Sequence, residues 1–206
     1  MEDVLSLYKE PYRETHPVVC MDESSKQHLR EVREKLPMKP GKSECYDTEY
    51  ERNGASNLFV FFEPLRGWRR IDVTDRRTAH DWAYQIKKLV DEDYPDAKKI
   101  HLVMDNLNTH AGTSLYKTFD PAEARRLLDK LEFHYTPKHG SWLNMAEIEF
   151  SVLSRQCMSD RMADRQYLTR EVGAWVTRRN MQNSEMNWRF TTEDARIKLK
   201  HLYPSF

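Results

Sequence analysis

The chain has 206 residues, of which 39% are hydrophobic and 32% charged, with 33 Lys and Arg balanced by 33 Asp and Glu. These values are typical of a soluble domain with a sizeable core and a charged surface. They exclude a membrane span, because no run approaches the roughly 20 apolar residues required, and the acidic first residues argue against a signal peptide.

The net charge of zero does not by itself indicate a nucleic-acid partner. The segment 155–200 has a local basic excess of four, with ten Lys and Arg against six Asp and Glu, which could serve phosphate contacts or an ordinary solvated helix surface. The three cysteines, Cys20, Cys45 and Cys157, lie far apart without CxxC spacing, which argues against a disulfide framework or a thiolate zinc site.

The order of hydrophobic patterns along the chain predicts an α/β fold with a mixed sheet. In chain order we expect a helix at 2–10, strands at 18–21, 58–63 and 69–75, a helix at 79–92, a strand at 100–104, a helix at 121–131, a strand at 131–137, and helices at 142–158 and 167–180. Residues 24–57 predict little, except that Asn53-Gly54 favours a tight turn.

Two of the predicted strands are short apolar runs that end in aspartate, VVCM before Asp22 and IHLVM before Asp105. If these strands are parallel neighbours, about 4.8 Å apart, both carboxylates lie at the carboxyl edge of the sheet, where α/β folds bind ligands. Close carboxylates repel each other, and a divalent cation relieves this repulsion. The alternative is that each aspartate caps a turn or helix.

A third acid is expected from the helix at 142–158. Glu147 and Glu149 lie about 80° to either side of its apolar stripe, so periodicity does not choose between them. Three such acids would allow two metal ions about 3.5–4 Å apart, the arrangement used for displacement at phosphorus.

Two segments, VMDNLNTH (103–110) and TPKHGSWLNMAEIEFSVLSRQ (136–156), closely resemble bacterial insertion-sequence transposases of the Tc/mariner-like superfamily. In that family Asn and then Thr-His follow the second catalytic aspartate, which corresponds here to Asp105. The last acid stands three residues after the Asn of Trp-Leu-Asn, which corresponds to Glu147. CMDE (20–23) matches the first-aspartate strand. The family's early helix proline is replaced here by Met145, and 113–131 resembles an insertion.

The resemblance implies an RNase H-like domain in which Asp22, Asp105 and Glu147 bind two Mg²⁺ or Mn²⁺ ions. It implies cleavage of DNA to free a 3′-hydroxyl, followed by strand transfer. The expected partners are transposon ends and target DNA, and the expected active assembly is a homodimer. The alternatives are a non-catalytic transposase remnant, or an RNase H-like nuclease without strand transfer.

Further residues are expected near the predicted acidic edge. His110, Lys138 and His139 would contact phosphate, or else cap loops or face solvent. Asn106 and Asn144 would orient the carboxylates or bond the backbone.

The expected organisation is a linker helix at 1–16, the catalytic domain at 17–182 and a tail at 183–206. The resemblance implies that the chain lacks the family's N-terminal helix-turn-helix region, which reads the element's ends. The expected location is the bacterial cytoplasm, associated with the nucleoid.

Overall fold

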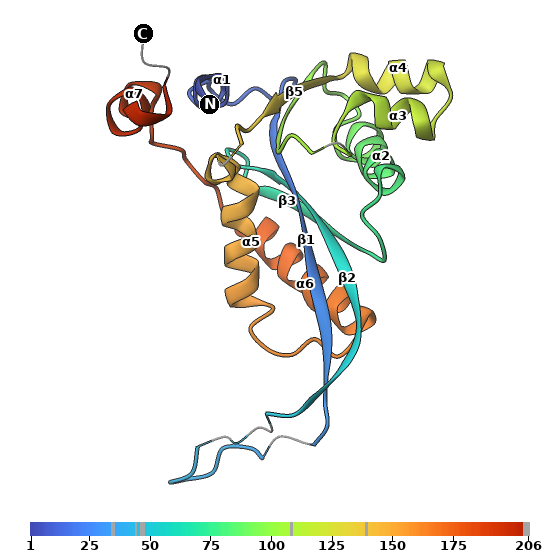
Figure 1. The fold of residues 1–206 in the computed structure, drawn as a ribbon, viewed down its shortest axis with the longest axis vertical. Helices are drawn as coiled ribbons and strands as arrows, with labels where there is room; N and C mark the ends of the chain where they lie inside the picture. Colours follow the sequence, from blue (N-terminus) through green and yellow to red (C-terminus); the bar gives the residue numbers. More distant parts are fainter. Residues whose placement is uncertain (34–35, 44, 46–47, 108, 139, 204–206) are drawn as a thin grey trace.

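The computed structural model describes residues 1–33, 36–43, 45, 48–107, 109–138 and 140–203, and within them five strands form one mixed sheet (Figure 1). The strands are β1 (Val18–Glu31), β2 (Tyr50–Glu63), β3 (Trp68–Thr74), β4 (Ile100–Met104) and β5 (Leu131–Tyr135). Their order is β3-β2-β1-β4-β5, with β1, β2 and β3 antiparallel and with β4 parallel to both β1 and β5. The predicted α/β class with a mixed sheet is confirmed.

Helices cover both faces of the sheet (Figure 1). One face carries α2 (Ala79–Lys88), α3 (Gly112–Thr118) and α4 (Pro121–Asp129), whereas the other carries α1 (Glu2–Leu7), α5 (Met145–Gln156) and α6 (Arg165–Met181). Beside α1 lies α7 (Thr192–Lys198), and the short helices are η1 (Leu89–Asp93), η2 (Ser141–Leu143) and η3 (Lys200–Leu202). No helix among the described residues is long and apolar enough to cross a membrane.

The sheet is buried on both faces, which explains why its central strands are continuous apolar runs. Val19, Met21, Phe59 and Phe61 pack toward α2 and α4, while the alternate residues of β1 and β2, such as Cys20, Val60 and Phe62, pack toward α1 and α5. The two strands that end in aspartate are parallel neighbours, with Cys20 opposite Val103, so the condition set for a shared acidic edge is met.

The prediction of a tight turn at Asn53-Gly54 is wrong. Both residues lie inside β2, and the register between Gln27–Ala55 and Leu29–Arg52 sets the two of them against the single residue His28. This is a β-bulge, in which Gly54 supplies the positive φ of 86° that the pattern had attributed to a turn.

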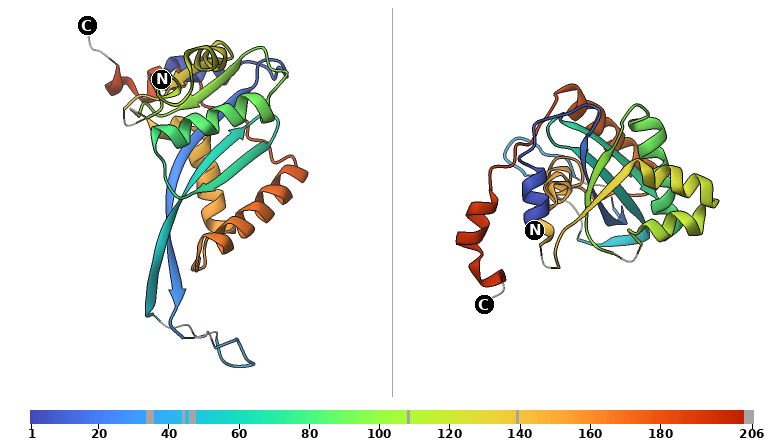
Figure 2. Two further views of the ribbon diagram at one scale, coloured as in Figure 1. Left: turned by 90° about the vertical axis from the view of Figure 1, so that its right-hand side faces the viewer. Right: turned by 90° about the horizontal axis from the view of Figure 1, so that it is seen from above.

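The strands β1 and β2 are also much longer than predicted, because their distal halves form a two-stranded ribbon that extends beyond the layered core (Figures 1 and 2). The ribbon is largely exposed and therefore polar in sequence, so it lacks the apolar alternation by which strands are recognised. The short helix α3 was also not predicted.

Candidate functional site

The two strand-end aspartates lie at the same height of the sheet. Asp22 and Asp105 each lie two residues beyond the paired Cys20 and Val103 of neighbouring parallel strands. Asp22 is still part of β1, whereas Asp105 directly follows β4. The pairing of β1 with β4 therefore brings both carboxylates to the carboxyl edge of the parallel strands.

Helix α5 begins beside this edge because Asn144 fixes its first turn. The Asn144 side chain caps the helix by accepting from the backbone N–H of Ala146 at 3.1 Å, and it donates to the carbonyl of Met21 at 2.8 Å. One buried amide thus joins the start of α5 to the residue before Asp22. Of the two roles expected for Asn144, the structure shows hydrogen bonding to the backbone. Glu147 lies in the first turn of α5 and is half-buried near the two aspartates.

The pKa of Asp22 shows that the charges of Asp105 and Glu147 act on its carboxyl group. Burial raises the pKa of Asp22 to about 7, a hydrogen bond from the Glu23 backbone N–H offsets part of this rise, and the negative charges of Asp105 and Glu147 add to it. A carboxyl that resists ionisation between two others is the arrangement that a bound cation would stabilise.

Glu149, the alternative third acid, is engaged elsewhere. It is completely buried and pairs with Arg69 of β3 at 2.7 Å and with Arg179 of α6 at 3.3 Å. Its charge is therefore used to hold α5 against β3 and α6. Glu147 is the glutamate of α5 whose charge acts on Asp22.

His110 connects two acids of this edge. Its Nδ1 donates to Asp105 Oδ1 at 2.6 Å, its Nε2 donates to Glu23 Oε1 at 2.9 Å, and its ring stacks on Trp82. Burial alone would lower the pKa of His110, but the hydrogen bonds with Asp105 and Glu23 outweigh burial and raise it to about 9. Fully buried and with both nitrogens occupied, His110 is placed to orient Asp105, which argues against the expected phosphate contact.

Glu23 was not singled out from the sequence, although its side chain is only 4% exposed and it holds the far side of His110. The available signal was the acidic pair Asp22-Glu23 directly after a buried strand. Alternation places neighbouring strand residues on opposite faces, so this pair alone does not indicate that both acids serve the edge.

A hollow of about 660 Å³ opens next to Asp105. Three of the predicted residues line it, namely Asp105, the exposed Asn106 and the exposed Lys138, together with Leu107, Thr136, Pro137 and Ser141. Lys138 thus provides a positive charge beside the acidic edge. His139 lies outside the described residues.

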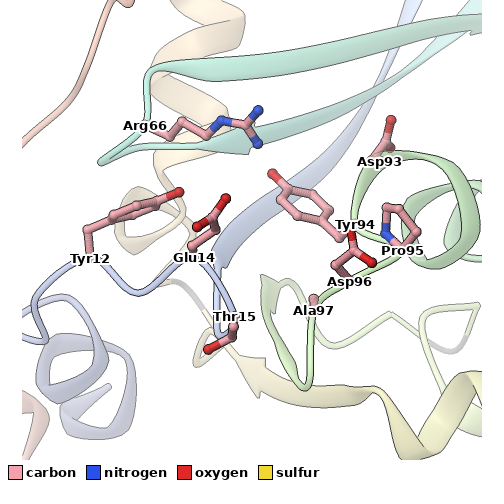
Figure 3. A pocket seen from close by; sticks show the side chains of 9 residues that line it. All are labelled: Tyr12, Glu14, Thr15, Arg66, Asp93, Tyr94, Pro95, Asp96 and Ala97. Atoms are coloured by element: carbon pink, nitrogen blue, oxygen red, sulfur yellow. The ribbon is translucent and has the colours of Figure 1, made fainter.

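A second hollow, of about 430 Å³, contains none of the predicted site residues (Figure 3). Its wall includes Thr15 and the segment Asp93–Ala97, which precede β1 and β4, so it lies at the opposite end of the parallel strands. The acidic edge is therefore the better candidate for a phosphate-processing site.

Comparisons with known proteins support this interpretation. The model of the DDE superfamily endonuclease family matches residues 17–169. No protein with curated annotation matches the chain. Among solved structures, the Mos1 mariner paired-end complex with Mn matches with a TM-score of 0.59 and 14% identity, over 88% of this chain and 55% of that one.

The Mos1 paired-end complex with Mg matches with a TM-score of 0.57 and 14% identity, over 98% of this chain and 60% of that one. The Mos1 strand transfer complex matches with a TM-score of 0.59 and 14% identity, over 88% of this chain and 55% of that one. This chain thus spans somewhat more than half the length of those proteins, and at this identity the likeness shows a shared RNase H-like fold. Because the family model covers most of its length, the chain belongs to the DDE superfamily of endonucleases.

Proposed function

We propose that the chain is the catalytic domain of a transposase, which cleaves DNA and joins the freed 3′-hydroxyl to a target strand. The observation that carries this proposal is the placement of three carboxylates, on β1, after β4 and on α5, such that the charges of Asp105 and Glu147 act on the half-buried Asp22 and raise its pKa. The fold shared with the Mos1 paired-end and strand transfer complexes agrees with it.

The residues present fit divalent metal ions. Carboxylate oxygens suit Mg²⁺ and Mn²⁺, and Mg²⁺ usually takes one or two carboxylates and completes its shell with water and phosphate oxygens. The metal ions, of which we propose two, would be held by Asp22, Asp105 and Glu147. When bound, the ions would activate the attacking oxygen and stabilise the leaving oxygen.

The remaining residues position these acids and the substrate. His110 holds one oxygen of Asp105, so the other oxygen stays available at the edge. Asn144 keeps the first turn of α5, and with it Glu147, beside the end of β1. Lys138, in the wall of the hollow beside Asp105, is placed to bind a phosphate of the DNA strand.

The partners follow from the same proposal. We propose that DNA, as element ends and as target, occupies the hollow beside Asp105, and that the active assembly is a homodimer. The domain limits at 16 and 182 and the cytoplasmic location stay predictions.

A calorimetric Mn²⁺ titration tests the metal site directly. We expect wild-type protein to bind Mn²⁺, and Asp22→Asn and Glu147→Gln each to weaken binding by at least roughly 100-fold, because even second-shell residues contribute 10–100-fold. The matched control is Glu92→Gln, an exposed carboxylate away from the edge, which should bind as wild type does. Equal binding by the Glu147→Gln protein would contradict the proposed third ligand.

The chemistry is tested with Mn²⁺ and a DNA duplex that carries a free 3′-hydroxyl end, incubated with a supercoiled plasmid. Transposase activity predicts end-joined products that Asp105→Asn abolishes. Nicking of the plasmid without joining would instead identify a nuclease. Neither activity in a protein that binds Mn²⁺ would indicate a non-catalytic remnant.

A further inference from the structure

A cluster of nitrogen and oxygen ligands lies at the other end of β4, remote from the acidic edge. His101 of β4 faces Glu132 of β5 in the parallel register, and His134, two residues further along β5, points to the same face. The His101 Nδ1 and His134 Nε2 atoms are 3.1 Å apart. The Glu132 carboxylate oxygens lie 3.7 Å from that Nδ1 and 3.6 Å from that Nε2.

We propose that His101, Glu132 and His134 form a second metal site, selective for Zn²⁺ or a similar late transition-metal ion. A tetrahedral zinc site with bonds of about 2.0–2.1 Å has neighbouring ligand atoms roughly 3.3 Å apart. The two histidine nitrogens are close to that separation, and one ligand atom of each of the three residues lies within 4.8 Å of the other two. Two histidines and one carboxylate are also a recognised zinc set that leaves one position open.

The surroundings of His134 strengthen this assignment. Its Nδ1 donates to the Asp3 carboxylate of α1 at 2.8 Å, which fixes the tautomer and leaves the Nε2 lone pair directed at His101 and Glu132. A carboxylate behind a metal-binding histidine is the usual outer-shell arrangement of zinc sites. His101 and His134 are almost buried, whereas the Glu132 side chain is 50% exposed, so the open position would face solvent.

The ligand chemistry separates the two sites of the molecule. The acidic edge offers only oxygen, which suits Mg²⁺ and Mn²⁺, whereas imidazole favours Zn²⁺ and Co²⁺. A metal at the histidine cluster, meaning His101, Glu132 and His134, would join β4 to the edge strand β5 and, through Asp3, both strands to α1. Its expected effect is to stabilise this edge of the fold, with water in the fourth position.

Cobalt absorption spectroscopy tests the proposal in a protein that carries Asp22→Asn and Asp105→Asn, so that the acidic edge does not compete. We expect one equivalent of Co²⁺ to give visible d–d bands that Zn²⁺ removes. Glu132→Gln and His134→Gln should each weaken Co²⁺ binding at least tenfold, and Asp3→Asn roughly tenfold. His201→Gln, which changes an exposed histidine of η3, should have no effect.

Glu132→Gln is the decisive variant, because its half-exposed side chain is replaced by one of the same shape and the fold is expected to persist by circular dichroism. The absence of d–d bands in the folded parent protein would overturn the proposal. Bands of equal strength in the parent, Glu132→Gln and His134→Gln proteins would also overturn it, since the metal would then lie elsewhere.

Discussion

The two ends of β4 carry polar clusters of opposite chemistry. At its carboxyl end, Asp105 meets Asp22 and Glu147, and the repulsion among them contributes to the raised pKa of Asp22. Near its start, about 13 Å away along the strand, His101 lies at hydrogen-bond distance from His134, and its Nδ1 is 3.7 Å from the nearest Glu132 oxygen. Three close carboxylates are electrostatically costly without a cation, whereas neutral imidazoles are not. The acidic edge therefore indicates a function more directly than the histidine cluster does.

The largest expected effect concerns Glu149, the carboxylate of α5 that pairs with two arginines. Glu149→Gln removes the charge that compensates the buried Arg69, and breaking a buried ion pair in this way costs about 3–5 kcal/mol of unfolding free energy. Guanidinium denaturation measures this loss. We expect the folded fraction of the variant to bind Mn²⁺ as wild type does.

Glu147→Gln is the matched comparison on the same helix, two residues away. It should leave the unfolding free energy unchanged or slightly raised, because it relieves repulsion around Asp22, while Mn²⁺ binding is lost. Had the roles been exchanged, Glu149→Gln would abolish Mn²⁺ binding at full stability, which would remove Glu147 from the site.

His110→Gln should have the next largest effect, about a 10–100-fold loss of Mn²⁺ affinity, since it removes the group that orients Asp105. The pKa of His110 is raised from its ordinary 6.5 to about 9, so the stability it confers is complete below pH 6.5 and disappears as pH rises through about 9. Thermal unfolding across this range should show the decline in wild type and in His80→Gln, an exposed-histidine control. The same decline in His110→Gln would assign it to another group.

The pH dependence of Mn²⁺ binding should be smaller and should follow Asp22. Because the folded protein holds this proton up to about pH 7 rather than its ordinary 3.8, Mn²⁺ must displace it at lower pH. Affinity is expected to fall by up to about tenfold per unit below pH 7 and to be nearly constant just above it. Without metal, the stability contributed by Asp22 changes in the opposite sense, falling as pH rises from about 4 through 7. Calorimetry at several pH values measures the first trend, and an affinity that is flat from pH 5 to 8 would contradict it.

The parts of the molecule that the sequence predicted correctly are those that use short-range signals. Two buried apolar runs that each end in aspartate predicted the pairing of β1 with β4, since such runs suit parallel strands. The distal ribbon of β1 and β2 had no such signal, because most of its residues are polar and its few buried side chains, such as His28 and Ser56, are polar as well. The bulge at Gly54 and a hairpin turn require the same positive φ, and the sequence does not distinguish them.

Within the site, the sequence could not predict the roles that depend on tertiary contacts. Helical periodicity left Glu147 and Glu149 equivalent, and the difference between them depends on Arg69 and Arg179, which lie on β3 and α6. The partners of His110 were likewise out of reach, because Glu23 is 87 residues away along the chain. The histidine cluster passed unnoticed because His101 and His134 occur singly in two strands, and only the register of β4 with β5 brings them together.

The smallest expected effect is that of a change in the histidine cluster on Mn²⁺ binding at the acidic edge, at the other end of β4. Glu132→Gln should leave Mn²⁺ affinity and Mn²⁺-dependent cleavage within about twofold of wild type, because the histidine cluster is about 13 Å from Asp105 and bears on stability alone. In the same variant, Zn²⁺ should no longer raise the melting temperature, as we expect it to do in the wild type. Calorimetry with Mn²⁺ and thermal unfolding with Zn²⁺ measure the two responses separately. A loss of cleavage in stably folded Glu132→Gln protein would mean that the ends of β4 are coupled, since no direct contact with Asp105 explains it.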